Sequence, residues 1–323
     1  MEVWRHSLEA APISGPFVVT LGTFDGVHAG HRELLRVAAN RAKALGHRAA
    51  VVTFDPHPTL VVAPQRKPKL LMTLEQRLAA FEAEAMDLAW VIPFSRAFSE
   101  LSPGLFLDRI QHVLAPVEIH VGRAFCFGRD RSGTVKTLED WGMAHSCQVH
   151  TLALRAIDGG RLSSTRIREA LDQGEVGAAA SLLGHPYTLT GVVVEGDRRG
   201  RHLGFPTANL AWEQEQLPAF GVYVTEAVLP HHGGARMGMT NVGEKPTFEG
   251  HRLTVETHLP GFEEDLYGAR MEVRFLHRLR GEAKFASVDE LRNQIAKDVA
   301  EGMAWWRTNR ASFVSTGYPP ASG

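Results

Sequence analysis

Cysteine is scarce in this sequence. Its 323 residues include only two, Cys126 and Cys147, which are too few for a disulfide framework and too far apart for a CxxC pair. Net charge is also nearly absent, at −1, so electrostatics gives no argument for a nucleic-acid or membrane-surface partner. We therefore expect a cytoplasmic protein with reduced thiols and no nucleic-acid partner.

Long hydrophobic runs are absent as well. No apolar stretch approaches the ~20 residues that a membrane helix needs, and the opening MEVWRHSLEAAP lacks the basic region and apolar core of a signal peptide. We expect no membrane association. Hydrophobic residues still make up 44% of the chain, which at this length is enough for two domains with separate cores.

The first half predicts an α/β domain. Residues 17–22 and 49–54 are rich in β-forming residues, and the intervening 31–46 has apolar residues at helical spacing before a glycine. Such a strand–helix–strand unit implies a parallel sheet with helices on its faces. Further predicted elements are a helix with a capping box at Thr73 and Gln76, strands at 88–94 and 117–122, and two short helices within 164–184 that close the domain.

The second half has a different pattern. From Tyr187 onward, short β-rich runs are separated by glycine, proline and charged turns, which predicts an antiparallel barrel or sandwich. A last helix, with Ser287 and Glu290 as its capping pair, is expected to dock on it. The predicted apolar face of that helix holds Val288, Leu291, Ile295 and Val299. We place the domain boundary between 184 and 185, which gives domains of 1–184 and 185–310 and a tail of 311–323.

The stretch GTFDGVHAGH, at 22–31, joins a predicted strand to a predicted helix. A glycine-rich turn at a helix N-terminus offers backbone N–H groups and the positive end of the helix dipole, which together favour phosphate. His28 and His31, three residues apart, fall on one side of the first helical turn and can reach the same anion. Asp25 either fixes the loop or binds a ribose hydroxyl. Each residue alone is explained by a tight turn or a helix cap, but the combination favours a phosphate site.

TFDPHP, at 53–58, is a second candidate segment. It ends the second strand with His57 between two prolines, and the carboxyl ends of strands are where open α/β sheets build their sites. His57 is therefore expected to face the same crevice as His28. The alternative is that Pro56 and Pro58 only terminate the strand.

RLSSTRIREAL, at 161–171, is a third candidate. Arg168 follows Ser164 by four residues and Thr165 by three, so hydroxyls and a guanidinium can converge on one side of a helix. Such a cluster suits the β- and γ-phosphates of a nucleotide. The alternative is a plain helix N-cap.

Together these motifs resemble a known family. GxFDGxHxGH resembles the HxGH signature of nucleotidyltransferases, and SSTRIR is similar to their second phosphate-binding motif. With TFDPHP and FSELSPGLF, at 98–106, the set resembles the N-terminal half of the bifunctional bacterial riboflavin kinase/FMN adenylyltransferases, or prokaryotic FAD synthetases. The resemblance implies a Rossmann-like fold in which His28 and His31 stabilise charge on the reacting phosphates.

The resemblance also implies two sets of ligand contacts in this domain. The implied ATP contacts are Gly22, Thr23, Phe24, Asp25, Gly26, His28, Gly30, His31, Ser163, Ser164, Thr165 and Arg168. The implied flavin contacts are Asp55, Pro56, His57, Pro58, Phe125 and Phe127.

The second half is similar to the kinase half of the same family. GVVVEGDRRGRHLGFPTANL, at 191–210, is similar to its ATP-binding segment, and PTAN to its metal-binding motif. Thr207 and Asn209 alternate onto one face of an extended segment, so a hydroxyl and an amide oxygen can approach one Mg²⁺. The implied ATP contacts of the kinase are Gly196, Gly200, Arg201, Gly204, Pro206, Thr207 and Asn209.

RLTVETHL, at 252–259, supplies a candidate base. Alternation puts Leu253, Val255, Thr257 and Leu259 on one face of a strand and Glu256 on the other, so the pattern alone leaves Glu256 either in solvent or in a ligand cleft. The family's catalytic glutamate has this setting, which implies that Glu256 takes the proton of the attacking alcohol. NVGEKPTF, at 241–248, resembles a family loop near the kinase site, with Asn241 as a flavin contact.

One segment departs from the family pattern. Where the family has GxDFRFG, this sequence has GRAFCFG at 122–128, so Ala124 replaces an acidic or amide side chain and Cys126 an arginine. An alanine cannot hydrogen-bond a nucleotide, which favours weaker ATP affinity. Phe125 and Phe127 remain as an apolar wall for an isoalloxazine or adenine ring.

The favoured interpretation is bifunctional flavin-cofactor synthesis with ATP and Mg²⁺. Riboflavin becomes FMN in the barrel, and FMN becomes FAD in the α/β domain. One alternative is a riboflavin kinase whose adenylyltransferase is weakened or lost through Ala124. The expected partners are riboflavin, FMN, FAD and ATP, and weak self-association is allowed.

Two other interpretations are less favoured. An adenylyltransferase for another acceptor, such as nicotinamide mononucleotide or phosphopantetheine, needs no second phosphotransfer site, so PTAN and VETHL argue against it. A flavin or nucleotide sensor, or a barrel-type RNA binder, would have lost catalysis. The sequence lacks the basic, aromatic-rich pattern of an RNA-binding surface.

Overall fold

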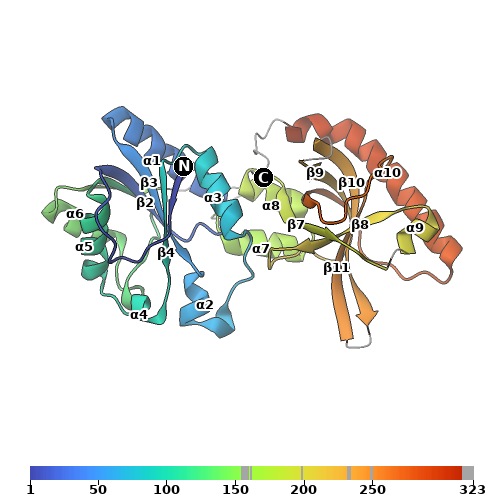
Figure 1. Ribbon diagram of the computed structural model, residues 1–323, viewed down its shortest axis with the longest axis horizontal. Helices are drawn as coiled ribbons and strands as arrows, with labels where there is room; N and C mark the ends of the chain where they lie inside the picture. Colours follow the sequence, from blue (N-terminus) through green and yellow to red (C-terminus); the bar gives the residue numbers. More distant parts are fainter. Residues whose placement is uncertain (154–159, 161, 198, 231–233, 248–249, 315–323) are drawn as a thin grey trace. The chain divides into compact units, whose positions relative to one another are not determined.

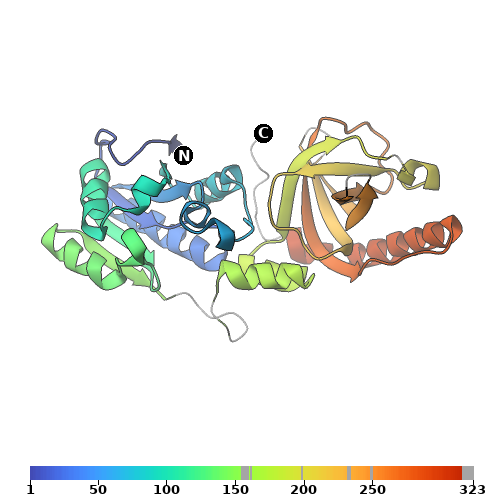
Figure 2. The same cartoon turned by 90° about the horizontal axis from the view of Figure 1, so that it is seen from below.

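The chain forms two compact units. The computed structural model describes residues 1–153, 160, 162–197, 199–230, 234–247 and 250–314. The first unit comprises Met1–Pro68 and Met72–Leu162, and the second Lys69–Leu71 and Ser163–Gly323. Figures 1 and 2 show the first as a sheet flanked by helices and the second as a barrel with a long helix. The predicted combination of an α/β domain with a small barrel is confirmed.

A six-stranded parallel sheet forms the middle of the first unit. Its strands are β1 (Glu2–Trp4), β2 (Phe17–Leu21), β3 (Arg48–Asp55), β4 (Leu88–Pro93), β5 (Pro116–Gly122) and β6 (Gln148–Leu152). They lie in the order β1-β4-β3-β2-β5-β6, with every neighbouring pair parallel. Strand β2 is buried along its whole length, as expected of a central strand covered on both faces.

The helices of the first unit follow the strands in sequence. They are α1 (Ala29–Leu45), α2 (Pro58–Val62), α3 (Leu74–Ala83), α4 (Arg96–Ser99), α5 (Pro103–Leu114) and α6 (Val135–Ala144), with 3-10 turns η1 (Pro64–Arg66) and η2 (Arg129–Arg131). Helix α1 ends at Gly46, whose φ of 68° suits a glycine. The predicted capping box of α3 is confirmed, because Thr73 and Gln76 each accept a hydrogen bond from the other's backbone N–H.

Helices α7 (Ser164–Asp172) and α8 (Val176–Leu183) lie in the second unit. The sequence pattern predicts a helix pair here that closes the first domain. The helix pair is confirmed, but α8 packs against strands β7 (Tyr187–Val194) and β12 (Arg270–Arg280) of the barrel. Buried Leu182 and Leu183 need an apolar surface to cover them, and the sequence does not specify which core provides it.

The second unit is built on a closed antiparallel barrel. Its other strands are β8 (Thr207–Trp212), β9 (Gly221–Leu229), β10 (Gly234–Thr247) and β11 (Gly250–His258), and the short helix α9 (Arg199–Leu203) lies between β7 and β8. The strand order is β10-β11-β8-β7-β12-β9. The hydroxyls of Thr225, Thr240 and Thr257, all fully buried, form a hydrogen-bonded row across β9, β10 and β11 at 2.8 and 2.9 Å. Each buried hydroxyl is thereby satisfied inside the barrel.

Two details of the barrel differ from the sequence-based prediction. The segment expected as a loop at 241–248 is instead strand through Thr247, the end of β10, and Phe248 lies outside the described residues. Of the four residues predicted to share one face of the strand at 252–259, Val255, Thr257 and Leu259 are buried, but Leu253 is 40% exposed. It lies toward the β10–β11 hairpin, where alternation no longer implies burial.

The last helix, α10 (Val288–Val314), docks on β9 and β10 as predicted. Ser287 Oγ accepts a hydrogen bond from the Glu290 backbone N–H at 3.2 Å, so the helix begins at the predicted cap. Val299, Trp305 and Trp306 pack against Val222, Val224 and Met239 of the barrel. Val288 was placed on this apolar face but is 66% exposed, because the first turn of the helix extends past the apolar cluster that the later turns cover.

Candidate functional sites

The predicted phosphate turn lies where the sheet topology reverses. From β2 the chain continues to β3 and β4 on one side and later crosses to β5 on the other. In open α/β sheets, ligands bind outside the strand carboxyl ends at such a switch point. Within the turn, Phe24 (φ 53°) and Val27 (φ 33°) hold left-handed backbone conformations although both are almost fully buried. Such strain is costly for residues with a Cβ and concentrates at functional sites.

His28 and His31 lie together, as the spacing predicts. Nδ1 of His28, the N-cap of α1, accepts a hydrogen bond from the His31 backbone N–H at 3.2 Å. The two rings stack with centroids 3.6 Å apart. Since Nδ1 of His28 is the acceptor, the proton of a neutral ring lies on Nε2. Nδ1 of His31 is buried and has no hydrogen-bond partner among the described residues.

Both histidines are neutral at pH 7. Burial lowers the pKa of His28 to about 4. Burial, together with the neighbouring His28, holds the pKa of His31 well below its ordinary value. The pair therefore offers N–H donors to an anion rather than a fixed positive charge, which the sequence pattern does not show.

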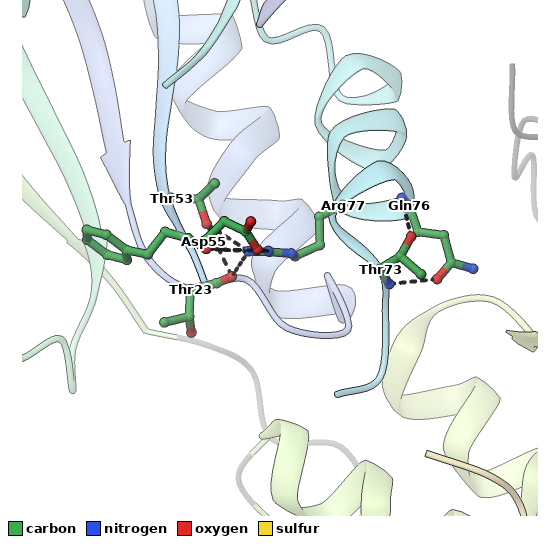
Figure 3. Close-up of polar contacts among 7 residues, drawn as sticks. Thr23, Thr53, Asp55, Thr73, Gln76 and Arg77 are labelled. Atoms are coloured by element: carbon green, nitrogen blue, oxygen red, sulfur yellow. Dashed lines mark hydrogen bonds and ion pairs between the residues drawn. The ribbon is translucent and has the colours of Figure 1, made fainter. Parts of the chain in front are cut away.

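Arg77 is a residue of this site that the sequence patterns do not single out. From α3 its NH1 donates to the Thr23 carbonyl at 3.0 Å, to Thr53 Oγ1 at 3.1 Å and to the Phe54 carbonyl at 3.3 Å (Figure 3). Its NH2 lies 3.7 Å from Asp55 Oδ1. One buried guanidinium thus joins the GTFDG turn after β2 to the end of β3.

The charge of Arg77 is balanced locally. Burial lowers the pKa of the Arg77 guanidinium, and the carboxylates of Asp25 and Asp55 oppose that shift. Asp25 is 4% exposed. The sequence carried one signal for this residue, because Arg77 occupies the same helix face as the buried Ala80 and Phe81. A charged residue on an apolar face needs partners in the interior.

His57 caps the short helix α2. Its Nδ1 accepts a hydrogen bond from the Thr59 backbone N–H at 3.2 Å, and Pro58 occupies the first turn. His57 therefore begins a helix directly after β3 ends at Asp55, and the cap leaves Nε2 of a neutral ring as the protonated nitrogen. The role of His57 toward a ligand stays a prediction.

A series of aromatic rings joins the ends of β3 and β5. Phe54, Phe94 and Phe98 are mutual neighbours with centroids 5.0 to 5.7 Å apart. Phe106 continues the series to Phe127 at 5.7 Å. The predicted Phe125 stacks on Phe127 at 5.4 Å. Phe106 and Phe127 belong to the buried core of the first unit, and Phe54, Phe98 and Phe125 pack against it. A ring-binding role for Phe125 and Phe127 stays a prediction, and Ala124 is exposed.

The SSTR motif begins helix α7. Ser163 Oγ accepts a hydrogen bond from the Arg166 backbone N–H at 3.4 Å, which makes Ser163 a helix N-cap. Arg168 Nε donates to the Lys69 carbonyl at 2.7 Å. Ser164, Thr165 and Arg168 share the helix as predicted. Their convergence with His28 on one phosphate chain stays a prediction, because α7 belongs to the second unit.

The barrel register brings the predicted kinase residues together. Glu256 of β11 lies directly opposite Asn241 of β10 on one side and Asn209 of β8 on the other. Residues directly opposite in antiparallel strands project their side chains to the same face. Two residues further along each strand, Thr207 lies opposite His258, whose Nδ1 pairs with the Pro206 carbonyl at 2.8 Å. Residues that are distant in sequence thus share one patch of the barrel wall.

Glycines let the chain approach this patch closely. A Cβ on Gly196 would lie 2.3 Å from the Asn209 side-chain amide, and one on Gly200 would lie 2.4 Å from the Phe205 carbonyl. Neither position can hold a larger residue without displacing its neighbour. Gly204 has a φ of 87° and open space around it. Arg201 is exposed on α9.

Lys245 is a second residue missed by the sequence patterns. Its Nζ forms an ion pair with Glu256 and lies 3.4 Å from Asp197 Oδ2. The side chain of Glu256 is 17% exposed, so it belongs neither to open solvent nor to the barrel interior. The carboxylate is thereby held in place and keeps an opening to the surface.

Comparison with known proteins assigns each half of the chain to a family. The FAD synthetase family model matches residues 11–166, and the riboflavin kinase family model matches 183–306. The chain is 36% identical to the bifunctional riboflavin kinase/FMN adenylyltransferases of Bacillus subtilis and of Escherichia coli strain K12. In each case the match covers 91% of this chain and 93% of the relative.

A solved structure also resembles most of the chain. It is a crystal structure of a protein named macrolide-efflux protein, from Streptococcus pneumoniae, with a TM-score of 0.85 and 30% identity, and the match covers 94% of this chain and 100% of that one. That protein's name refers to another activity, which is not carried over to this chain. Among the helices that the structure describes, none is long and apolar enough to cross a membrane.

The fold and the family matches define the class of protein. A nucleotidyltransferase-type α/β sheet is followed in one chain by a riboflavin-kinase-type barrel. The chain belongs to the family of bifunctional riboflavin kinase/FMN adenylyltransferases. Because both halves match, the comparisons support two activities and not a kinase that has lost adenylyl transfer through Ala124.

Proposed function

We propose that the protein carries out the two reactions of its family at two separate sites, one on the barrel and one at the GTFDGVHAGH turn. Riboflavin kinase transfers the γ-phosphoryl group of ATP to riboflavin, which gives FMN and ADP. FMN adenylyltransferase joins FMN to the AMP part of a second ATP, which gives FAD and diphosphate. The domains that perform them are 185–310 and 1–184, respectively.

The observation that carries the kinase assignment is the register of Asn209, Glu256 and Asn241 across three strands. Glu256 accepts the proton of the riboflavin 5′-hydroxyl as that oxygen attacks the γ-phosphate. Asn241, on the same face, hydrogen-bonds the flavin. Without ATP, Lys245 neutralises the Glu256 carboxylate. The phosphate groups of bound ATP compete for the Lys245 ammonium group and thereby free Glu256 to act as the base.

Oxygen donors suited to Mg²⁺ lie in the same patch. Thr207 and Asn209 are two residues apart on β8, so a hydroxyl and an amide oxygen face the same side. Such hard ligands, few in number, fit an ion that keeps several waters and binds chiefly through phosphates. We therefore assign these two residues to Mg²⁺, which would neutralise charge on the β- and γ-phosphates. The glycines at 196, 200 and 204 and Arg201 contact the ATP, and Pro206 orients the strand start.

Adenylyl transfer is assigned to the turn after β2. Its nucleophile is the FMN phosphate, which is already anionic, so the step needs in-line placement and charge stabilisation rather than a base. His28 and His31 donate N–H groups to the α-phosphate. Ser164, Thr165 and Arg168 hold the leaving diphosphate, and the flavin ring lies against Phe125 and Phe127 near His57.

The kinase assignment is tested by Glu256→Gln, which removes the base and keeps the shape. We expect riboflavin phosphorylation to fall by about 10²-fold or more, while FAD formation from supplied FMN is retained. The matched control is Glu244→Gln on the same β10–β11 hairpin, where the glutamate pairs with exposed His251. Flavins separated by chromatography report both rates, and FMN formation at the wild-type rate in Glu256→Gln overturns the assignment.

We also place the protein in the cytoplasm. Cys126 and Cys147 are both free thiols, which suits a reducing compartment. Subcellular fractionation with detection of the full-length protein tests this placement, and recovery outside the cytosolic fraction would contradict it.

A further inference from the structure

A second group of polar side chains lies in the first unit and is assigned to neither reaction. Glu118 and His120 alternate on β5, so they share one face of the sheet. His150 of the neighbouring strand β6 lies directly opposite His120 in the register, and the two rings stack with centroids 4.7 Å apart. Glu118 and His120 are buried, and His150 is 45% exposed on its side chain.

The three side chains converge on a common point. His120 Nε2 lies 3.0 Å from Glu118 Oε2, and His150 Nε2 lies 3.6 Å from the same oxygen. The three potential ligand atoms all lie within 4.8 Å of one another. Bonds from zinc to nitrogen or oxygen are about 2.0 to 2.2 Å, so ligand atoms around a tetrahedral ion stand about 3.3 Å apart. The two distances to Glu118 Oε2 bracket that spacing, and the potential ligand nitrogen atoms of the two imidazoles lie within 4.8 Å of each other.

We propose that Glu118, His120 and His150 form a binding site for a divalent transition-metal ion, with Zn²⁺ as the probe. One carboxylate and two imidazoles are a donor set that zinc accepts, with water in the fourth position. Strand β6 is at the edge of the sheet, so the exposed His150 gives the ion a path from solvent. A bound ion would fasten the edge strand to β5.

Arg41 supplies positive charge to Glu118 when no metal is bound. This residue of α1 donates from Nε to Glu118 Oε2 at 3.1 Å and from NH2 to Oε1. The arginine side chain is 45% exposed, so it can swing into solvent. A metal ion and Arg41 therefore compete to compensate one buried carboxylate.

The first test is zinc binding by the full-length protein. After chelator treatment, Zn²⁺ is titrated against a chromophoric chelator with wild type, His150→Ala and His145→Ala. His145 is a partly exposed histidine on the same unit, 3.9 Å from Asp108, and serves as the matched control. We expect one zinc per chain in wild type and His145→Ala, and affinity at least about tenfold weaker in His150→Ala. Equal affinity in all three proteins, or no stoichiometric binding by wild type, overturns the proposal.

The second test uses Arg41→Gln, which leaves the buried carboxylate of Glu118 without its cation. The variant should melt at a lower temperature than wild type, and Zn²⁺ should raise its melting temperature more than that of wild type. Adding His150→Ala to Arg41→Gln should remove this gain. If zinc leaves the melting temperature of Arg41→Gln unchanged, the site does not exist.

Discussion

At the residue scale, Arg77 is a buried charge that connects two segments of the candidate adenylyl-transfer site. Its guanidinium bonds the carbonyls of Thr23 and Phe54 and the hydroxyl of Thr53 (Figure 3). These residues belong to the phosphate turn and to the end of the next strand. If the turn performs adenylyl transfer as proposed, we expect Arg77 to act as a positioning residue for it.

Replacing Arg77 should affect one activity only. In Arg77→Met we expect kcat/KM for FAD formation to fall by about tenfold or more, because loop misplacement removes preorganised contacts. Arg77→Lys restores the charge without the planar fork and should be intermediate. Riboflavin phosphorylation by the same samples checks that the chain is folded. An Arg77→Met enzyme with full FAD formation would show that the arginine does not position the turn.

The two stacked histidines make stability depend on pH. His28 has a folded pKa of about 4 against 6.5 in the unfolded chain, so between these values only the unfolded state takes up the proton. The contribution of His28 to the free energy of unfolding is complete above pH 6.5 and is lost as the pH falls toward 4. Between pH 7 and pH 5 we expect the free energy of unfolding to fall by about 2 kcal/mol because of His28, and His31 adds to this loss.

Calorimetric melting of wild type and His28→Gln at pH 7 and pH 5 measures this contribution. The variant should lose less stability over that interval. The low pKa of Glu118, about 2 because of Arg41 and His120, affects stability only at lower pH. Parallel losses in wild type and His28→Gln would mean that His28 is not a buried neutral ring.

Sequence patterns singled out the candidate ligand-binding residues but not the residues that contact and hold them. His28, Glu256 and Asn209 stand in recognisable motifs, because a motif records residues close together along the chain. Arg77 contacts Phe54, 23 positions away along the chain, and Lys245 contacts Glu256, 11 positions away. A local sequence pattern does not reveal contacts between residues that far apart. The pKa shifts depend on burial, which is likewise a property of the fold.

At the element scale, strand register is what assembles the kinase patch. Alternation along β11 predicted that Glu256 faces away from the side that buries Val255 and Thr257, and this is confirmed. It could not predict that Glu256 lies opposite Asn241 and Asn209. Register is fixed by barrel closure and not by any one strand. The loop expectation for 241–248 came from its resemblance to a family loop, and the structure corrects it because β10 continues through Thr247.

Gly196, in the segment that follows β7, lies against Asn209 of β8, and adding one methyl group at Gly196 tests whether this close contact matters. In Gly196→Ala the new Cβ would lie 2.3 Å from the Asn209 amide, so the amide must move from its place beside Glu256. We expect kcat for FMN formation to fall by about tenfold or more, with FAD formation from supplied FMN unchanged. The control is Gly177→Ala in α8, where a Cβ meets nothing within 4 Å. Equal FMN rates in the two variants would rule out this role for Gly196.

At the scale of the whole molecule, two units with separate cores hold two sets of chemical groups. Composition and motifs predicted one α/β unit and one barrel, which is confirmed. They did not predict that α7 and α8 belong to the barrel unit, because an apolar helix face does not specify the core that it covers. The division of activities at residue 184 stays a prediction about function.

The central claim, that two sites in one chain perform successive reactions, is tested most directly by complementation. His28→Ala and Glu256→Gln are incubated with riboflavin, ATP and Mg²⁺, separately and mixed, and the flavins are separated over time. We predict that His28→Ala accumulates FMN, that Glu256→Gln leaves riboflavin unchanged, and that the mixture makes FAD. The contrary result is a mixture that makes no FAD although Glu256→Gln converts supplied FMN to FAD, or a single variant that makes FAD from riboflavin at the wild-type rate.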